Sequence, residues 1–277
     1  MNPTRILIDA DVLAFRASAV VEEKVDWGDG EVEWVVPDVS EAIDAAKHLV
    51  DQVTSEIYGS LVMCASDSGG TFRAAINPSY KSNRANSRRP ELLPDVHDWL
   101  RSNFQYETWT NLEADDVIGI MSSPEYDGTE SIIVSSDKDF YTLPGRLFWR
   151  IWTKEESLGI QHVDPLGANL TLFKQILMGD RIDGYNGIPG VGEKKAMRMI
   201  DGWIEQWTAC DRCVSDEEFW SFVWSCVEQA YSRSDKIADG LTEAHLSAHM
   251  AYILRGPESY MEDIGWVNLW DPAAGGL

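Results

Sequence analysis

The sequence predicts an α/β fold with a mostly parallel central sheet flanked by helices, followed by a helical C-terminal part. Three short apolar runs, 5–9, 61–67 and 132–137, predict buried strands, and each ends in an aspartate. Helix-like segments separate these runs, and such alternation is typical of a parallel sheet that is covered on both faces. We place the α/β part at residues 1–160 and the helical part at residues 161–277.

The elements between the first two strands have their own signals. Residues 25–36 alternate apolar and polar side chains around Gly28-Asp29-Gly30, which predicts a β-hairpin. Residues 40–58 carry an apolar stripe at helical spacing, with Ser40 as the predicted N-cap.

The chain changes character after about residue 160. Asp164 followed by Pro165 predicts an N-cap and the first position of a helix that runs through residue 177. Helical patterns continue to about residue 253. Within them, Trp220 and Trp224 are four positions apart, and we expect this pair to pack in a core.

Charge and composition exclude several classes of protein. The 277 residues include 46 acidic and 23 basic side chains, a net charge of −23, so bulk charge does not attract polyanions. A basic stretch without acids nevertheless lies between Asp67 and Glu91; its members are Arg73, Lys81, Arg84, Arg88 and Arg89. No apolar run approaches the roughly 20 residues of a membrane helix, and the first residues do not resemble a signal peptide. Four cysteines indicate a reducing compartment rather than a disulfide scaffold.

Carboxylates form short clusters around the ends of the predicted elements. The members are Asp9, Asp11, Asp67, Glu113, Asp115, Asp116, Asp137, Asp139, Asp180 and Asp183. Because sites in parallel sheets form beyond the carboxyl ends of the strands, we expect these side chains to converge there. A divalent cation removes their mutual repulsion, and oxygen-only ligands favour Mg²⁺ or Mn²⁺. Their number indicates two ions about 4 Å apart; for Asp11, capping the following helix is an equal alternative.

A glycine-rich turn follows the last acidic cluster. It reads Gly-Ile-Pro-Gly-Val-Gly over residues 187–192 and precedes Lys194 and Lys195. Backbone N–H groups in such a turn, together with a helix N-terminus, can approach a phosphate closely. The turn therefore predicts a contact with a nucleic-acid backbone that does not read sequence.

Taken together, these motifs resemble the 5′ nuclease (flap endonuclease-like) superfamily, and in detail its phage T7-type 5′-exonucleases. The matching segments are residues 8–11, 80–84, 112–117, 135–140 and 178–192, in that order. The resemblance implies a PIN-like nuclease core and a C-terminal helix–three-turn–helix that grips duplex backbone, with K⁺ bound by main-chain carbonyls.

The resemblance also implies roles for individual residues. The implied metal ligands are Asp9, Asp67, Glu113, Asp115, Asp116, Asp137, Asp139, Asp180 and Asp183. Lys81 matches a lysine on the scissile phosphate, Arg84 a phosphate-steering arginine, and Tyr80 an aromatic that stacks on the terminal base. The other implied DNA contacts are Arg88, Arg89, Gly187, Gly190, Gly192, Lys194 and Lys195.

Our hypothesis is therefore a monomeric two-metal 5′→3′ exonuclease in which Asp9, Asp137, Lys81 and Arg84 carry the catalysis. The expected partners are duplex DNA with a 5′ end, flap DNA and RNA–DNA hybrids, with no membrane. If the protein is phage-encoded, it acts in the cytoplasm of the infected host during replication and host-DNA breakdown. Two alternatives stay open: a haloacid-dehalogenase-type phosphatase with Asp9 as nucleophile, and a non-catalytic paralogue that binds DNA structures.

Overall fold

We describe a computed structural model of the chain, covering residues 4–26, 28, 32–209, 215–261 and 265–272. Its centre is a six-stranded sheet in the order β5-β4-β1-β6-β7-β8. The strands are β1 (Arg5–Asp9), β4 (Ser60–Cys64), β5 (Gln105–Glu107), β6 (Ser131–Ser135), β7 (Leu147–Arg150) and β8 (Ile160–His162). Neighbouring strands run parallel except at the edge, where β8 is antiparallel to β7. The predicted mostly parallel sheet is confirmed.

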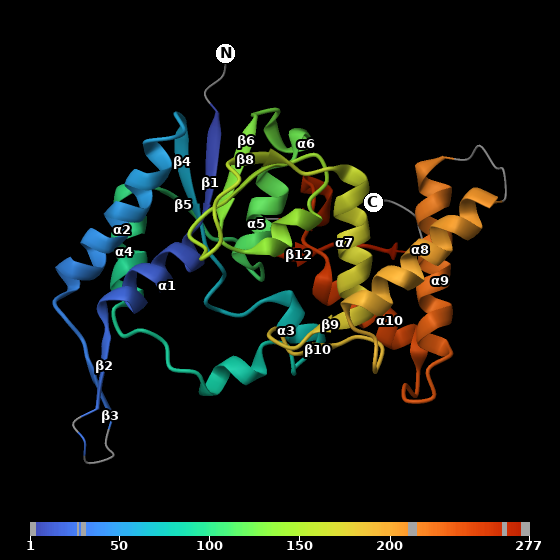
Figure 1. Cartoon of the computed structure of the whole chain (residues 1–277). Helices are drawn as coiled ribbons and strands as arrows, with labels where there is room; N and C mark the ends of the chain where they lie inside the picture. Colours follow the sequence, from blue (N-terminus) through green and yellow to red (C-terminus); the bar gives the residue numbers. More distant parts are fainter. Residues whose placement is uncertain (1–3, 27, 29–31, 210–214, 262–264, 273–277) are drawn as a thin grey trace.

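The central strand β1 sends alternate side chains into two separate cores. Ile6 and Ile8 pack with α1 (Ala10–Val21), α2 (Val39–Thr54) and α4 (Leu93–Asn103) on one face. Leu7 packs with α5 (Ala114–Met121) and α7 (Pro165–Met178) on the other. Figure 1 shows these two helical layers on either side of the sheet. Burial on both faces explains why the strand is apolar along its length.

The second of these cores continues into the C-terminal helices α8 (Glu193–Ala209), α9 (Asp216–Ser232) and α10 (Gly240–Ala251). Phe173 of α7 stacks on Trp220 of α9, with ring centroids 5.6 Å apart and planes 13° apart. Trp224 is 1% exposed, so the predicted packing of this tryptophan pair is confirmed. The helical part and the sheet therefore share one continuous core.

Short elements connect these layers. The predicted hairpin is confirmed as β2 (Glu23–Asp26) paired antiparallel with β3 (Val32–Val35); most of its turn lies outside the described residues. The remaining helices are α3 (Phe72–Ile76), η1 (Ser82–Asn86), α6 (Pro124–Asp127), η2 (Lys138–Thr142) and η3 (Pro257–Ser259). The remaining strands are β9 (Gly179–Asp180), β10 (Tyr185–Asn186), β11 (Tyr260–Met261) and β12 (Trp266–Val267).

Several predicted helix boundaries move by a few residues. The helix predicted over 40–58 is α2, which ends at Thr54 and is capped by Asp38 instead of Ser40, because the Asp38 carboxylate accepts from the Ser40 amide. Asp9, not Asp11, caps α1. Asp164 caps α7 as predicted, accepting from the Gly167 amide at 2.7 Å.

Candidate active site

The carboxyl ends of β1 and β6 bring Asp9 and Asp137 to one edge of the sheet. Asp9 is 2% exposed and accepts from the Val12 amide at 3.0 Å and from the Ser135 hydroxyl at 2.8 Å. The Ser135 hydroxyl in turn accepts from the Asp137 amide at 3.0 Å. Ser135 therefore ties the two strand ends together and holds the two aspartates beside each other.

The third acid at this edge is Asp115, in the first turn of α5. Burial, followed by the charges of Asp9 and Asp137, raises the pKa of Asp115 well above its usual range. Burial, followed by Asp11 and Asp137, raises the pKa of Asp9 to about 7. We call Asp9, Asp115 and Asp137 the acidic triad. Besides burial, the charge of Asp137 disfavours ionisation of Asp9, and the charges of Asp9 and Asp137 disfavour ionisation of Asp115.

A second set of acids adjoins the acidic triad through Asp137. Burial, then Asp137, raises the pKa of Asp139 to about 7, and Asp183 and Asp180 add to the effect. The Asp139 carboxylate accepts from the Gln175 side chain at 2.7 Å. Asp180 accepts from the Asp183 amide at 3.2 Å, which keeps these two acids in one tight turn.

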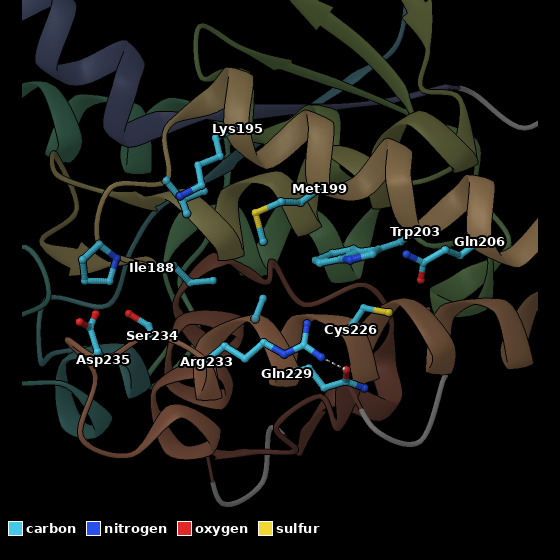
Figure 2. Close-up of a pocket in the computed structure, with 13 residues that line it drawn as sticks. Ile188, Lys195, Met199, Trp203, Gln206, Cys226, Gln229, Arg233, Ser234 and Asp235 are labelled. Carbon is cyan, nitrogen blue, oxygen red and sulfur yellow. Dashed lines mark hydrogen bonds between the residues drawn. The ribbon is translucent and has the colours of Figure 1, made fainter.

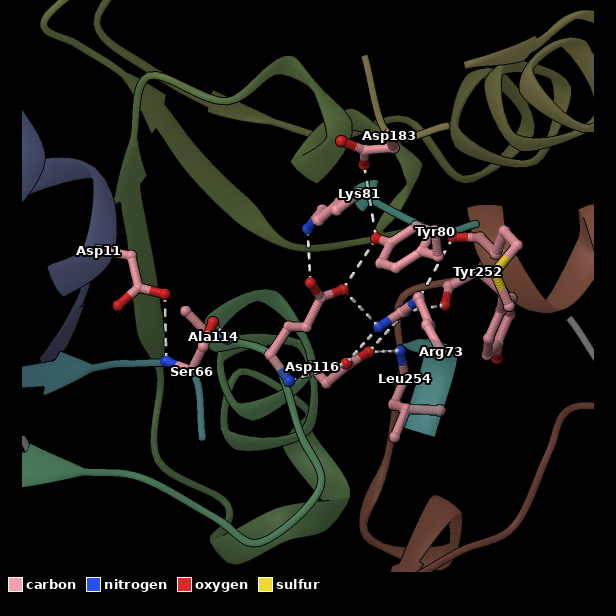
Figure 3. A network of polar contacts seen from close by, with 12 residues as sticks. Asp11, Ser66, Arg73, Tyr80, Lys81, Ala114, Asp116, Asp183, Tyr252 and Leu254 are labelled. Atoms are coloured by element: carbon pink, nitrogen blue, oxygen red, sulfur yellow. Dashed lines mark hydrogen bonds and ion pairs between the residues drawn. The ribbon is translucent and has the colours of Figure 1, made fainter. Parts of the chain in front are cut away.

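Arg73 is the centre of a network beside the acidic triad (Figure 3). Its guanidinium is 2% exposed and donates to both carboxylate oxygens of Asp116, at 2.5 and 2.8 Å. It also donates to Glu113 at 3.0 Å and to the backbone carbonyl of Tyr252 at 2.6 Å. The Leu254 amide donates to Asp116 at 3.2 Å. The network thus joins α3, α5 and the C-terminal segment.

Lys81 lies between this network and the acidic residues. Its ammonium donates to Glu113 at 2.5 Å, and its backbone amide donates to the Asp183 carbonyl at 2.7 Å. Burial opposes the charge on Lys81, but Glu113, Asp183 and Asp115 outweigh it and raise its pKa. The pKa of Glu113 is lowered, because Arg73 and Lys81 outweigh the burial that would raise it. Lys81 is therefore held as a cation at the edge of the acidic site.

Arg84 and Tyr80 flank Lys81 in different ways. Arg84 is half-exposed and forms an ion pair with Asp183. Tyr80 is 7% exposed and donates to Glu113 at 2.9 Å. The Tyr80 ring is buried beside Lys81, and the stacking role that the resemblance implies for it stays a prediction. Arg84 faces solvent next to the site, where a phosphate can reach it.

Two of the predicted metal ligands lie outside the acidic triad, with both of their oxygens in hydrogen bonds to the protein. Asp116 is 0% exposed, and both of its oxygens accept from Arg73. Asp67 accepts from the Gly69 and Asn111 backbone amides, each at 2.9 Å, and so connects the segment after β4 to the segment before α5. Among the residues that the structure describes, no three His, Cys, Asp or Glu side chains form a ready-made ligand set.

The remaining carboxylates nevertheless fit a hard divalent cation. Their donors are all oxygens, which suit Mg²⁺ and Mn²⁺. Burial, and after it the neighbouring carboxylates, raise the pKa values of Asp9, Asp115 and Asp139, and a bound cation would offset both effects.

The rest of the predicted basic track follows the segment between η1 and α4. Arg88 forms an ion pair with Glu22 and lies 4.1 Å from the ring centroid of Trp34, so its guanidinium is shared with the hairpin. Arg89 is exposed. The structure thus places Arg84 and Arg89 on the surface, whereas Arg88 also supports the β2–β3 hairpin.

The glycine-rich turn connects β10 to α8 and reaches close to the end of α7. The Ile188 amide donates to the Leu177 carbonyl at 2.9 Å, and a Cβ on Gly187 would lie 2.2 Å from the Met178 backbone. Only glycine fits at position 187. By contrast, a Cβ on Gly190 or Gly192 would meet nothing within 4 Å. These two glycines leave the outer side of the turn open, beside the exposed Lys194 and Lys195.

A groove of about 620 Å³ runs from this turn between α8 and α9 (Figure 2). Ile188, Met199 and Trp203 line it with apolar surface, while Lys195 and Arg233 place cations along it.

Sequence reasoning missed two features of the site. It grouped Arg73 with the exposed bases, and no pattern around Phe72-Arg73-Ala74 marks that arginine as buried. It also did not connect Asp11 with His97, whose ring nitrogen lies 3.8 Å from the Asp11 carboxylate. Asp11 further accepts from the Ser66 amide at 3.1 Å, so it links α1 to the end of β4 and does not cap its helix.

Known proteins resemble the chain in both sequence and fold. Residues 4–164 match the family model described as "5′-3′ exonuclease, N-terminal resolvase-like domain". The exodeoxyribonuclease of Enterobacteria phage T3 is 25% identical, with 96% of this chain and 92% of that protein covered. The exonuclease of Escherichia phage T7 is 26% identical, with 96% and 93% covered. The bacteriophage T5 D15 flap endonuclease has a similar fold, with a TM-score of 0.53 at 17% identity over 90% of this chain and 93% of that one.

Within the part of the chain that the structure describes, no helix is both long and apolar enough to cross a membrane. The family match spans the whole sheet and its acidic edge, from β1 to the N-cap of α7. The chain therefore belongs to the 5′-3′ exonuclease family.

Proposed function

We propose that the chain hydrolyses phosphodiester bonds of duplex DNA from 5′ ends, using two divalent cations. The observation that carries this proposal is the acidic triad at the carboxyl end of the sheet, with Lys81 and Arg84 beside it. Cations held by the carboxylates and the basic groups of Lys81 and Arg84 can together stabilise the negative charge of a bound phosphate. The similarity to the T3 and T7 enzymes over nearly the whole chain supports the same reading.

The residues proposed to hold Mg²⁺ or Mn²⁺ are Asp9, Asp115, Asp137, Asp139, Asp180 and Asp183. Such ions supply a Lewis acid and activate a water for in-line attack on phosphorus. Glu113 is proposed to contribute through Lys81, since ion pairs with Arg73 and Lys81 already neutralise its carboxylate.

Lys81 and Arg84 are proposed to bind the scissile phosphate. The raised pKa of Lys81 keeps its ammonium charged, so it can stabilise negative charge that develops on the phosphate oxygens. Arg84 must exchange its ion pair with Asp183 for a contact with phosphate, and its exposure allows that exchange. Both residues act by charge and hydrogen bonding, without a covalent intermediate.

The glycine-rich turn is proposed to grip the duplex. Gly190 and Gly192 leave its backbone open, and Lys194 and Lys195 add charge at the start of α8. Arg88 and Arg89 would continue the contact toward the hairpin. We also propose a K⁺ site at the main-chain carbonyls of the turn.

The range of substrates is proposed to extend beyond duplex ends. The bacteriophage T5 D15 structure of similar fold is a flap endonuclease complex with DNA and metal ions. We propose that this chain likewise acts on flap DNA, and also on RNA in RNA–DNA hybrids, as a monomer. We also propose a role in phage replication and host-DNA breakdown inside the infected cell; the similarity to the exonucleases of phages T3 and T7 supports a phage setting.

The alternative of a phosphatase with a nucleophilic Asp9 is disfavoured by the contacts of that residue. Asp9 is 2% exposed, and its two oxygens accept from Val12 and Ser135. A nucleophile needs an oxygen that a phosphoryl group can approach in line, whereas a cation needs only a lone pair that these hydrogen bonds leave unused.

The test is hydrolysis of 5′-labelled duplex, flap and hybrid substrates in Mg²⁺, with product sizing, by the wild type and by Asp137→Asn. We expect 5′→3′ products from the wild type and loss of activity in Asp137→Asn. Asp44→Asn, which changes a carboxylate on the exposed side of α2, is the matched control. Full activity of Asp137→Asn, or hydrolysis of a small phosphomonoester in place of DNA, would contradict the proposal. A wild type that binds DNA but releases no product would favour the non-catalytic paralogue.

A further inference from the structure

We propose that Arg73 is a positioning residue: it directs the Lys81 ammonium by orienting the Glu113 carboxylate that holds it. The inference rests on the role proposed above for Lys81. Arg73 itself does not touch the acidic triad, and its partners are Glu113, Asp116 and the C-terminal backbone.

The Glu113 carboxylate has its two oxygens divided between two tasks. One oxygen accepts from Arg73 at 3.0 Å and from the Tyr80 hydroxyl at 2.9 Å. The other accepts from Lys81 at 2.5 Å. Glu113 is also the N-cap of α5, so its backbone is anchored where the helix begins. Rotation of the carboxylate would break its contacts with Arg73, Tyr80 and Lys81. The orientation of Glu113 therefore fixes the position of the Lys81 ammonium.

Arg73 can orient Glu113 because it is itself held from several directions. Both Asp116 oxygens accept from it, and so do the backbone carbonyls of Met250 and Tyr252, at 3.2 and 2.6 Å. Figure 3 shows Asp116 and Tyr252 beside the Arg73 guanidinium. A lysine ammonium is a single point donor and cannot span the same set of acceptors. The planar fork is what connects the C-terminal segment to Glu113.

The competing interpretation is that Arg73 only neutralises two buried acids. Both interpretations predict lower stability when Arg73 changes, so stability does not separate them. They differ in whether the effect on turnover passes through Lys81, and a double-mutant cycle measures that difference.

The experiment compares wild type, Arg73→Lys, Lys81→Ala and the double variant on a 5′-labelled duplex in Mg²⁺. We expect Arg73→Lys to lower kcat about 10- to 100-fold with KM changed less than about 3-fold, because a small misplacement of a catalytic group affects the chemical step. In the Lys81→Ala background, Arg73→Lys should lower kcat less than about 2-fold further.

Tyr80→Phe gives a second test that leaves the packing of the ring in place. It removes one of the two donors to Oε2 of Glu113, the oxygen that also accepts from Arg73. We expect kcat to fall about 3- to 10-fold, again only when Lys81 is present. This variant decides the matter if Arg73→Lys does not fold.

Arg5→Lys is the matched control. Arg5 is 8% exposed, donates to both oxygens of Asp127 and to the Met121 carbonyl, and lies at the opposite end of β1 and α5. We expect it to lower the melting temperature much as Arg73→Lys does, with kcat within about 2-fold of wild type.

The outcomes separate the two proposals. If Lys81→Ala retains full activity, the role proposed for Lys81 fails, and the inference on Arg73 fails with it. If Lys81→Ala loses activity but Arg73→Lys lowers kcat by the same factor in both backgrounds, Lys81 keeps its role and the positioning inference is overturned. Equal losses of kcat in Arg5→Lys and Arg73→Lys would also overturn it.

Discussion

Asp115 and Asp116 are neighbours on α5, yet they belong to two regions with opposite electrostatics. Asp115 belongs to the acidic triad, where burial and the two other acids raise its pKa well above the usual range. Asp116 faces the Arg73 network, where a bidentate guanidinium and the Leu254 amide use its oxygens. Two consecutive residues of one helix thus lie in two different sites. In one the negative charge is uncompensated, and in the other it is already neutralised.

The comparison shows which carboxylates are available to a cation. A carboxylate that is satisfied by arginine contributes to the fold, because removing its partner leaves a buried charge. A carboxylate that is surrounded by other carboxylates costs stability and is retained for what it binds. Residue type and spacing are the same in both cases, and only the surroundings assign the role.

The largest expected effect is on catalysis, from Asp115→Asn. We expect kcat/KM to fall about 10³-fold in Mg²⁺, because a proposed ligand of the divalent cation is lost. The free energy of unfolding should stay the same or rise at neutral pH, since a carboxylate whose pKa is raised by folding loses an unfavourable charge. Nuclease assays and urea unfolding measure the two effects. A loss of stability without a loss of activity would contradict the role proposed for Asp115 as a ligand of the cation.

Asp116→Asn is expected to show the reverse balance. It weakens a buried pair with Arg73, and we expect the free energy of unfolding to fall by about 3 kcal/mol. Urea unfolding monitored by tryptophan fluorescence measures this loss. Asp127→Asn, which affects the more exposed partner of Arg5, should cost less. If Asp116→Asn were as stable as wild type, the Arg73 network would not hold the C-terminal segment to α5.

Gly119→Ala tests the packing of that segment directly. A Cβ at Gly119 would lie 2.1 Å from the Leu254 carbonyl oxygen, so the segment must move away from α5. We expect a loss of about 1–3 kcal/mol in the free energy of unfolding. Gly202→Ala on α8 is the control, because its Cβ would meet nothing within 4 Å and alanine favours the helix. Equal effects of the two substitutions would contradict the close contact.

The smallest effect is expected at the glycine-rich turn. Replacing both Lys194 and Lys195 with alanine should weaken duplex binding by a similar factor for all sequences and reduce the slope of log K against log salt by about 2. Fluorescence anisotropy of a labelled duplex at several salt concentrations measures this slope. Lys47→Ala, on the exposed side of α2, should leave it unchanged. An unchanged slope in the double variant would remove the turn from the DNA contact.

Much of the architecture could be predicted from local patterns. The apolar runs that become β1, β4 and β6 supply side chains to the cores on both faces of the sheet, and their short length favours strands over helices. Strands β5, β7 and β8 were not predicted, because three or four residues at the side of a sheet carry too little periodicity to detect. Helix caps shifted where two capping residues compete, as Asp38 and Ser40 do at α2.

The sequence by itself determined the α/β class, the acidic edge of the sheet and the glycine-rich turn, because each depends on residue types at short spacing. Only the tertiary structure decided which acids pair with Arg73 and which remain in the acidic triad. Arg73 comes from α3, its carbonyl partners from residues 250–252, and Asp116 from α5, so their meeting depends on contacts between distant segments. That long-range contact turns one of two adjacent aspartates into a structural ion pair and leaves the other in the acidic triad.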